Sequence, residues 1–95
     1  MVRVFVRHAV ADYERWRQEY DSFGKERGPL GVRGEGAFQS VDDPNDVTVL
    51  HDFDNLEQAQ AFVSSEALLQ ALGRAGVEGE PEIWFVTEAR EGAST

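Results

Sequence analysis

Residues 2–10 alternate with a period of two, and this alternation limits the fold more than any other feature of the chain. One parity holds Val2, Val4, Val6, His8 and Val10, and the other holds Arg3, Phe5, Arg7 and Ala9. Successive side chains of a β-strand point to opposite faces of its sheet. One face of this strand is therefore nearly all valine, whereas the other mixes arginine with phenylalanine. The pattern predicts a sheet that carries a helix layer on one side only.

A helix is predicted directly after this strand. Asp12 can act as its cap, because a carboxylate accepts hydrogen bonds from the free amide groups of a first helical turn. Aromatic residues then recur at spacings of three, four and three, namely Tyr13, Trp16, Tyr20 and Phe23. This spacing places them in one stripe along a helix. Residues 24–28, which begin and end with glycine, are expected to terminate it.

Three more strands and a second helix follow. Strands are predicted over residues 32–41, where glycines weaken the pattern, and over 47–53, with a turn at 42–46 between them. Asn55 opens the second helix. The sequence leaves open whether Ser64 and Ser65 break this helix before residues 66–75 complete it. Pro81 is expected to begin the last strand, over 82–88, and residues 89–95 to fray.

The order β-α-β-β-α-β predicts one α+β domain of the ferredoxin-like kind over residues 1–88. Its four-stranded antiparallel sheet would carry both helices on one face. Apolar residues on the other face would stay uncovered by the chain's own helices, namely Phe5, Leu50, Trp84 and Val86. An open apolar sheet face on a small domain normally meets a partner. We therefore expect a two-fold homodimer in which two sheets close into a barrel.

The charge balance and the cysteine count exclude several classes of function. Eighteen acidic residues against nine basic ones give a net charge of −9, which repels phosphate backbones and anionic lipids. We expect neither nucleic acid nor membrane as a partner. The chain has no cysteine, so disulfides and thiolate nucleophiles are excluded. Arg3, Arg7 and His8 interrupt the apolar residues at the N-terminus, which predicts no signal peptide and favours the cytoplasm.

The two histidines are the main candidates for chemistry. His8 lies at the carboxyl end of the first strand, and a neutral imidazole suits general acid or base catalysis. The alternative is a buried histidine whose ring donates to a backbone carbonyl or to the region of Asp12. His51 lies on the apolar face of its strand and would share a layer with His8. Because no third ligand accompanies them at metal-binding spacing, neither a metal site nor a cofactor is expected.

Side chains of two further kinds have both a structural and a functional interpretation. Tyr13, Trp16 and Tyr20 are either core residues or the wall of a cavity in which a flat substrate stacks on Trp16. Arg3 and Arg7 lie at the strand positions that face away from the helices, and their charges need carboxylate partners there. Carboxylates are available at Glu35, Asp52, Glu82 and Glu88. The arginines form salt bridges between subunits, or they anchor a substrate carboxylate.

Several segments resemble a known family. They are His8-Ala-Val-Ala-Asp12-Tyr13-Glu-Arg-Trp16, Asp-Asp-Pro-Asn at 42–45, Ala59-Gln-Ala-Phe62-Val-Ser-Ser65 and Ala75-Gly76-Val77. Together they resemble the small cyclase-like members of the dimeric α+β barrel superfamily, over residues 1 to about 88. That superfamily also holds antibiotic-biosynthesis monooxygenases and aromatic polyketide cyclases. The resemblance implies a ferredoxin-like protomer, a homodimeric barrel, and a cavity between sheet and helices or at the barrel mouth.

Two hypotheses about function follow, and the sequence leaves open whether the chain is an enzyme. The first is a dimeric barrel that binds a flat apolar or aromatic metabolite, as a cofactor-free cyclase or monooxygenase-like enzyme would. His8 would then act as the acid or base, with Tyr13, Trp16, Tyr20 and His51 as binding residues. The second is a non-enzymatic dimeric module for ligand binding or assembly. A roomy aromatic pocket would favour the first, and a sealed interior with both imidazoles bonded to backbone would favour the second.

Overall fold

The alternating N-terminal strand lies at the centre of the sheet. In the computed structural model, which describes residues 1–89, β1 (Val2–Val10) pairs on one side with β3 (Asp46–Phe53) and on the other with β4 (Val77–Thr87). β2 (Gly34–Gln39) pairs with β3 at the outside. All pairings are antiparallel, and the strand order is β2-β3-β1-β4. The predicted ferredoxin-like α+β arrangement is confirmed.

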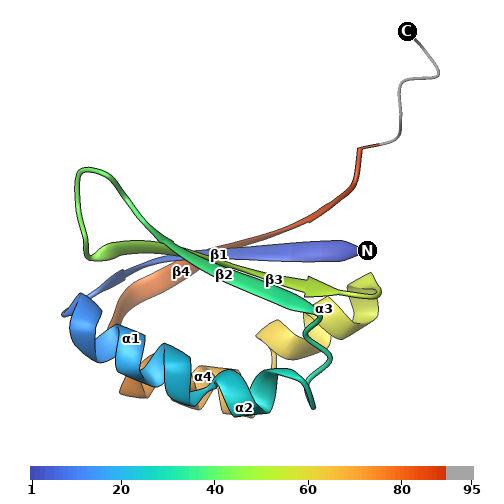
Figure 1. The fold of residues 1–95 in the computed structure, drawn as a ribbon, viewed down its shortest axis with the longest axis horizontal. Helices are drawn as coiled ribbons and strands as arrows, with labels where there is room; N and C mark the ends of the chain where they lie inside the picture. The colour runs from blue at the N-terminus through green and yellow to red at the C-terminus, as the bar shows by residue number, and fades with distance from the viewer. Residues whose placement is uncertain (90–95) are drawn as a thin grey trace, which may run out of the picture.

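The helices all lie on one face of this sheet and leave the other face open (Figure 1). They are α1 (Tyr13–Ser22), the short α2 (Gly24–Arg27), α3 (Leu56–Val63) and α4 (Glu66–Arg74). Asp12 caps α1 as predicted, because its Oδ1 accepts from the amide of Glu14. Within residues 1–89, no helix has the length and apolarity needed to cross a bilayer. The expected fraying at the C-terminus falls almost wholly outside the described residues.

The second helix is broken, which the sequence had left open. α3 ends at Val63 and α4 begins at Glu66. Ser65 caps α4, because its Oγ accepts from the amide of Leu68 at 3.2 Å and donates to the carbonyl oxygen of Phe62 at 2.8 Å. One side chain thus satisfies groups of both helix ends, and the chain can change direction there without leaving buried polar backbone.

The core lies between the valine face of β1 and the helices. Among its largest fully buried side chains are Phe53, Phe62, Val4 and Val47. The ring of Phe62, from α3, lies 5.2 Å from that of Phe53 and 4.8 Å from the imidazole of His51. Tight aromatic packing therefore fixes the end of the sheet that α3 covers.

Two strands differ in their bounds from the prediction. β4 begins at Val77 and not at residue 82, so Pro81 lies inside it. An edge strand tolerates proline where no ladder hydrogen bond is needed, and the β1–β4 register shifts between Arg7 and Ala9 at this point. Gly79, with φ of +69°, lies in the shifted segment. β2 is shorter than predicted, because the amide of Val32 donates to the carbonyl oxygen of Arg27 instead of joining the ladder.

The open face of the sheet carries an apolar row between two charged rows. Trp84, Phe5 and Leu50 are paired in register across β4, β1 and β3. The rings of Phe5 and Trp84 stack with centroids 5.3 Å apart. Trp84 keeps 41% and Val86 keeps 38% of its surface exposed. The prediction that the chain's own helices leave this face uncovered is thereby confirmed.

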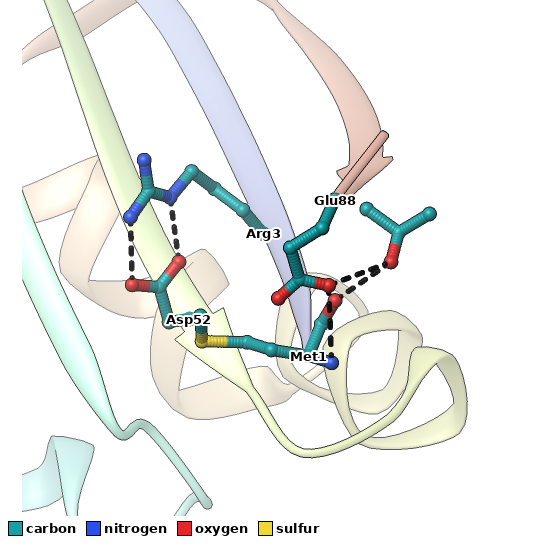
Figure 2. Close-up of polar contacts among 5 residues, drawn as sticks. Met1, Arg3, Asp52 and Glu88 are labelled. Atoms are coloured by element: carbon teal, nitrogen blue, oxygen red, sulfur yellow. Dashed lines mark hydrogen bonds and ion pairs between the residues drawn. The ribbon is translucent and has the colours of Figure 1, made fainter. Parts of the chain in front are cut away.

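Each outward arginine is paired within its own chain. Arg3 donates from Nε and Nη2 to the two oxygens of Asp52, at 2.6 and 3.0 Å (Figure 2). Arg7 engages both oxygens of Asp46 in the same way, at 3.0 and 2.7 Å. Hydrogen bonds from Arg3 hold the pKa of Asp52 below its usual value. Within this chain both partners therefore lie on the neighbouring strand β3, and Asp52 is one of the carboxylates that the sequence offered.

The break between α3 and α4 yields a test with a matched control. Ser65→Ala removes both hydrogen bonds of the hydroxyl and should lower the free energy of unfolding by about 1 kcal/mol. Ser64→Ala is the control, because Ser64 is exposed and its hydroxyl has no hydrogen bond within residues 1–89. Urea unfolding followed by circular dichroism measures both. Equal losses in the two variants would contradict the assigned cap.

Candidate functional site

A small cavity lies between the helix layer and the valine face of the sheet. Its volume is about 40 Å³. β1 and β3 form its floor, and α1, α2 and α4 form its walls. The polar and aromatic lining residues are His8, Trp16, Glu19, Tyr20, Phe23, Arg27 and His51. α4 contributes Leu68, Ala71 and Leu72 to the lining, and Ala75, directly after α4, also lines the cavity.

Most of the predicted site residues meet at this cavity. His8, Trp16, Tyr20 and His51 line it, whereas Tyr13 does not. The ring of Tyr13 stacks on Trp16 with a centroid distance of 5.7 Å. Tyr13 therefore supports the wall from behind the lining residue and is not itself part of the lining.

The two histidines occupy opposite ends of the cavity floor. His8 pairs in register with Val47, and His51 pairs with Val4. Four residues of β1 separate these two rungs, which corresponds to roughly 13 Å along the strand. The stacked rings of Trp16 and Tyr20, with centroids 4.9 Å apart, lie between them, because Trp16 contacts His8 and Tyr20 contacts His51.

Buried polar atoms without a protein partner gather around this cavity. Within residues 1–89 neither nitrogen of His8 has a hydrogen-bond partner, and the same holds for Nδ1 of His51 and the hydroxyl of Tyr20. Leaving a buried polar group unpaired costs about 1–3 kcal/mol. The structural alternative for His8, a ring that donates to a backbone carbonyl, is therefore wrong for the described part of the chain. Such atoms are available to a ligand.

Burial keeps both imidazoles neutral. It lowers the pKa of His8 to about 4, although the carboxylate of Asp46 opposes the shift. Burial also lowers the pKa of His51 to about 4; the positive charge of Arg27 adds to this shift, and Asp52 opposes it. At neutral pH each ring therefore carries one N–H donor and one acceptor nitrogen.

Arg27 is the lining residue that the sequence analysis missed. Its guanidinium lies over the ring of Tyr20, 4.0 Å from the centroid, and only 8% of the residue is exposed. Its Nε donates to Nε2 of His51 at 3.3 Å, and its Nη2 donates to the carbonyl oxygen of Tyr20 at 2.8 Å. Residues 24–28 had been interpreted only as a helix end. Arg27 follows Phe23 by four residues and so continues the aromatic stripe, which is the signal that could have found it.

The described residues offer no evident place for a metal. Between Met1 and Ala89, no group of three histidine, aspartate or glutamate side chains lies close enough together to hold an ion. The two histidines also lie on rungs of the sheet that are four residues apart along β1. That the protein works without a metal or cofactor stays a prediction of the sequence.

Comparison with known proteins gives the fold. No family model matches the chain, and no curated protein matches it. Among solved structures, a candidate antibiotic biosynthesis monooxygenase from Bordetella bronchiseptica superposes with a TM-score of 0.81 at 10% identity, over 94% of this chain and 97% of that one. SnoaB, a cofactor-independent oxygenase from Streptomyces nogalater, gives 0.77 at 9% identity, over 97% and 96%. The chain has the fold of the antibiotic biosynthesis monooxygenases.

A third similar structure is described only as a conserved protein. A conserved protein from Methanosarcina mazei Go1 superposes with a TM-score of 0.75 at 16% identity, over 93% of this chain and 92% of that one. The likeness confirms the predicted ferredoxin-like fold. Because a fold hosts many functions, the function has to be argued from the cavity.

The lowered histidine pKa values predict a loss of stability in mild acid. An unfolded histidine titrates near pH 6.5, so between pH 6.5 and about 4 the unfolded chain binds protons that folded His8 and His51 do not. The free energy of unfolding should therefore fall as the pH drops through this window, by up to about 3 kcal/mol per histidine.

Urea unfolding at several pH values between 7 and 4 measures this loss. His8→Gln and His51→Gln should each flatten the dependence on pH, and comparison with the unsubstituted chain cancels the titration of the carboxylates. A pH dependence that neither substitution changes would contradict the assigned neutral, buried imidazoles.

Proposed function

We propose that the cavity binds a flat aromatic metabolite that carries hydroxyl or carbonyl groups, and that the protein acts on it as a cofactor-free, monooxygenase-like enzyme. The observation that carries this proposal is the set of unpartnered buried polar atoms on His8, Tyr20 and His51 around one cavity. A ligand with oxygen substituents would satisfy them. The shared fold with SnoaB, a cofactor-independent oxygenase, supports the reaction class.

The walls suit a flat molecule. The rings of Trp16 and Tyr20 are stacked on each other with an inclination of 22°, so their edges form one aromatic wall, and α4 contributes aliphatic side chains to another. The present volume of about 40 Å³ holds a water molecule but no metabolite. A ligand therefore has to move α4 away from α1. These helices are joined at the cavity's edge by the ion pair of Arg74 with Glu19, at 3.2 Å.

His8 is the residue we expect to carry the chemistry. Its neutral ring has an acceptor nitrogen without a protein partner in residues 1–89. A phenolic hydroxyl placed there would donate a hydrogen bond to that nitrogen. The negative charge that develops on the phenolic oxygen would raise the pKa of the imidazole, so that the O–H bond breaks, an N–H bond forms and a phenolate remains. A phenolate donates electrons to dioxygen more readily than the phenol does. Tyr20, Trp16 and His51 would bind the ring system, with Tyr13 holding Trp16 in place.

The alternative is a non-enzymatic dimeric module, and the small cavity volume favours it. A water molecule or two would fit in about 40 Å³ and could satisfy the same polar atoms. On that alternative, no aromatic ligand binds and the site serves only the packing of the protein.

Ligand binding can be tested through Trp16, with Trp84→Phe introduced throughout so that Trp16 is the only tryptophan. Fluorescence titration with phenols and hydroquinones of one to three rings measures affinity, and an oxygen electrode measures turnover. Tyr20→Phe should weaken binding about tenfold, because the ligand loses a buried hydrogen bond. Tyr13→Phe is the matched control and should have little effect. His8→Gln should abolish turnover.

The same series separates the two functions. If His8→Gln, His8→Ala and His51→Ala leave binding and turnover unchanged, the assigned roles are wrong. If no ligand in the panel binds to the unsubstituted cavity, the non-enzymatic alternative takes the place of the proposal.

We also propose that a second copy of the chain covers the open sheet face. The apolar row of Trp84, Phe5 and Leu50 lies there without a cover, and β4 is apolar on both faces. Ile83 and Phe85, on its inner face, keep 41% and 36% of their surface exposed. Two such faces packed together would form a closed barrel with two-fold symmetry.

A charge in the apolar row should separate the subunits. Trp84→Glu places a carboxylate where the two sheets would meet, so sedimentation equilibrium should give a monomer for this variant and a dimer for the unsubstituted chain. Val41→Glu is the control, because Val41 is fully exposed in the turn before β3 and its substitution should leave the dimer intact. A monomeric unsubstituted chain would contradict the proposal.

A further inference from the structure

Arg27 is a buried cation without a carboxylate. It is 8% exposed and lines the cavity, and within residues 1–89 no acidic oxygen lies within ion-pairing distance of it. Asp21, an acid whose charge acts on Arg27, is paired with Arg17 at 3.1 Å. A buried charge is costly unless an opposite charge and hydrogen bonds compensate it.

The chain supplies such compensation elsewhere. Arg3 and Arg7 are more exposed than Arg27, yet each is held by both oxygens of an aspartate. The sequence contains eighteen acidic residues, so carboxylates are not scarce. At Arg27 the partners within residues 1–89 are all neutral: the ring and carbonyl oxygen of Tyr20, and a nitrogen of His51. They hold the guanidinium in place but leave its charge unmatched.

The neighbouring groups at this end of the cavity are hydrogen-bond donors as well. Because Nε2 of His51 accepts from Arg27, the proton of the neutral ring is assigned to Nδ1. That Nδ1–H has no partner within the described residues, and neither does the hydroxyl of Tyr20. Three donor groups therefore line the cavity where the aromatic wall ends, whereas a free acceptor nitrogen is available at His8, at the other end.

We propose that Arg27, with His51 and Tyr20, forms a subsite for an oxyanion, so that the ligand is an aromatic anion, a carboxylate or a phenolate. This inference rests on the proposed function, because it names the class of ligand that the same cavity takes. The anionic oxygen would face Arg27, while the ring lies along Trp16 and Tyr20. It would receive charge-assisted hydrogen bonds, which are stronger than neutral ones.

The decisive experiment compares three ligands of one ring size in the Trp84→Phe background. They are 2-naphthoate as the carboxylate, 2-naphthol as the phenol, and 2-naphthamide as the neutral isostere of the carboxylate. At pH 7 and 0.15 M salt, 2-naphthoate should bind at least about tenfold more tightly than 2-naphthamide. The net charge of −9 opposes this preference, so it has to come from groups that line the cavity. Affinity for 2-naphthol that rises as it ionises would indicate a phenolate as the ligand.

Substitutions then assign the preference to Arg27. Arg27→Gln should abolish the discrimination between 2-naphthoate and 2-naphthamide, and Arg27→Lys should keep part of it. Arg33→Gln is the matched control, because it removes the same charge at an exposed residue that is paired with Asp54 at 3.0 Å and does not line the cavity. Thermal unfolding of each variant checks that it folds. The comparison of the three ligands itself is made with Arg27 unsubstituted.

Each outcome decides between the two proposals. If 2-naphthamide binds as tightly as 2-naphthoate, and Tyr20→Phe weakens both, the cavity binds aromatics but the oxyanion subsite is wrong. Discrimination that survives Arg27→Gln in a folded variant also overturns the assignment to Arg27. If none of the three ligands binds, the proposed function fails and the subsite fails with it.

Discussion

The two-residue alternation of β1 is the constraint on which the rest of the structure depends. β1 is a central strand, so every second side chain must enter the layer beneath the helices and the others must lie in the middle of the open face. His8 points to the same face of the strand as four valines and is therefore buried, whether or not its ring finds hydrogen-bond partners. Arg3 and Arg7 are directed outward by the same rule. The core, the cavity and the open face thus follow from one short segment.

The inner layer combines a tightly packed part with a part that tolerates unsatisfied groups. Phe53 and Phe62 are fully buried and pack near α3 with their rings tilted by 49°, and their apolar contacts stabilise the fold. Beneath α1 and α4 the same sheet face carries imidazoles and a guanidinium whose polar atoms are incompletely paired. Such destabilising groups persist in native proteins mainly at functional sites. The contrast between the two parts of one layer is the physical basis for placing function at the cavity.

Periodicity predicted more of this arrangement than single residues did. The alternation of β1 and the three-four spacing of the aromatic residues were sufficient to place His8 and Trp16 together, because both patterns specify a buried face. They could not place Tyr13 correctly, because a residue on the right face of a helix can still lie beside a cavity instead of lining it. The bounds of β4 were missed because the effect of Pro81 depends on whether its strand lies at an edge.

Arg27 and the salt bridges escaped prediction for a different reason. A buried arginine is rare, and residues 24–28 were interpreted only as the end of a helix, although Arg27 continues the stripe that Phe23 ends. The partners of Arg3 and Arg7 depend on the register of β3 against β1, which periodicity does not determine. In the register found, Asp52 lies opposite Arg3 and Asp46 lies within reach of Arg7.

The two faces of the sheet differ in how their charges are paired. On the open face the arginines are neutralised within the chain, so a second copy would meet a row of apolar side chains between ion pairs that are already complete. Inside the cavity Arg27 is left without such a partner in the described residues. An acidic surface around a buried cation excludes hydrophilic anions, which keep their hydration and gain little from entering an apolar cavity. On the proposed function, the cavity would still bind an anion that is attached to an aromatic ring. Burial of the ring against Trp16 and Tyr20 would supply favourable free energy that the charge of the anion does not supply by itself.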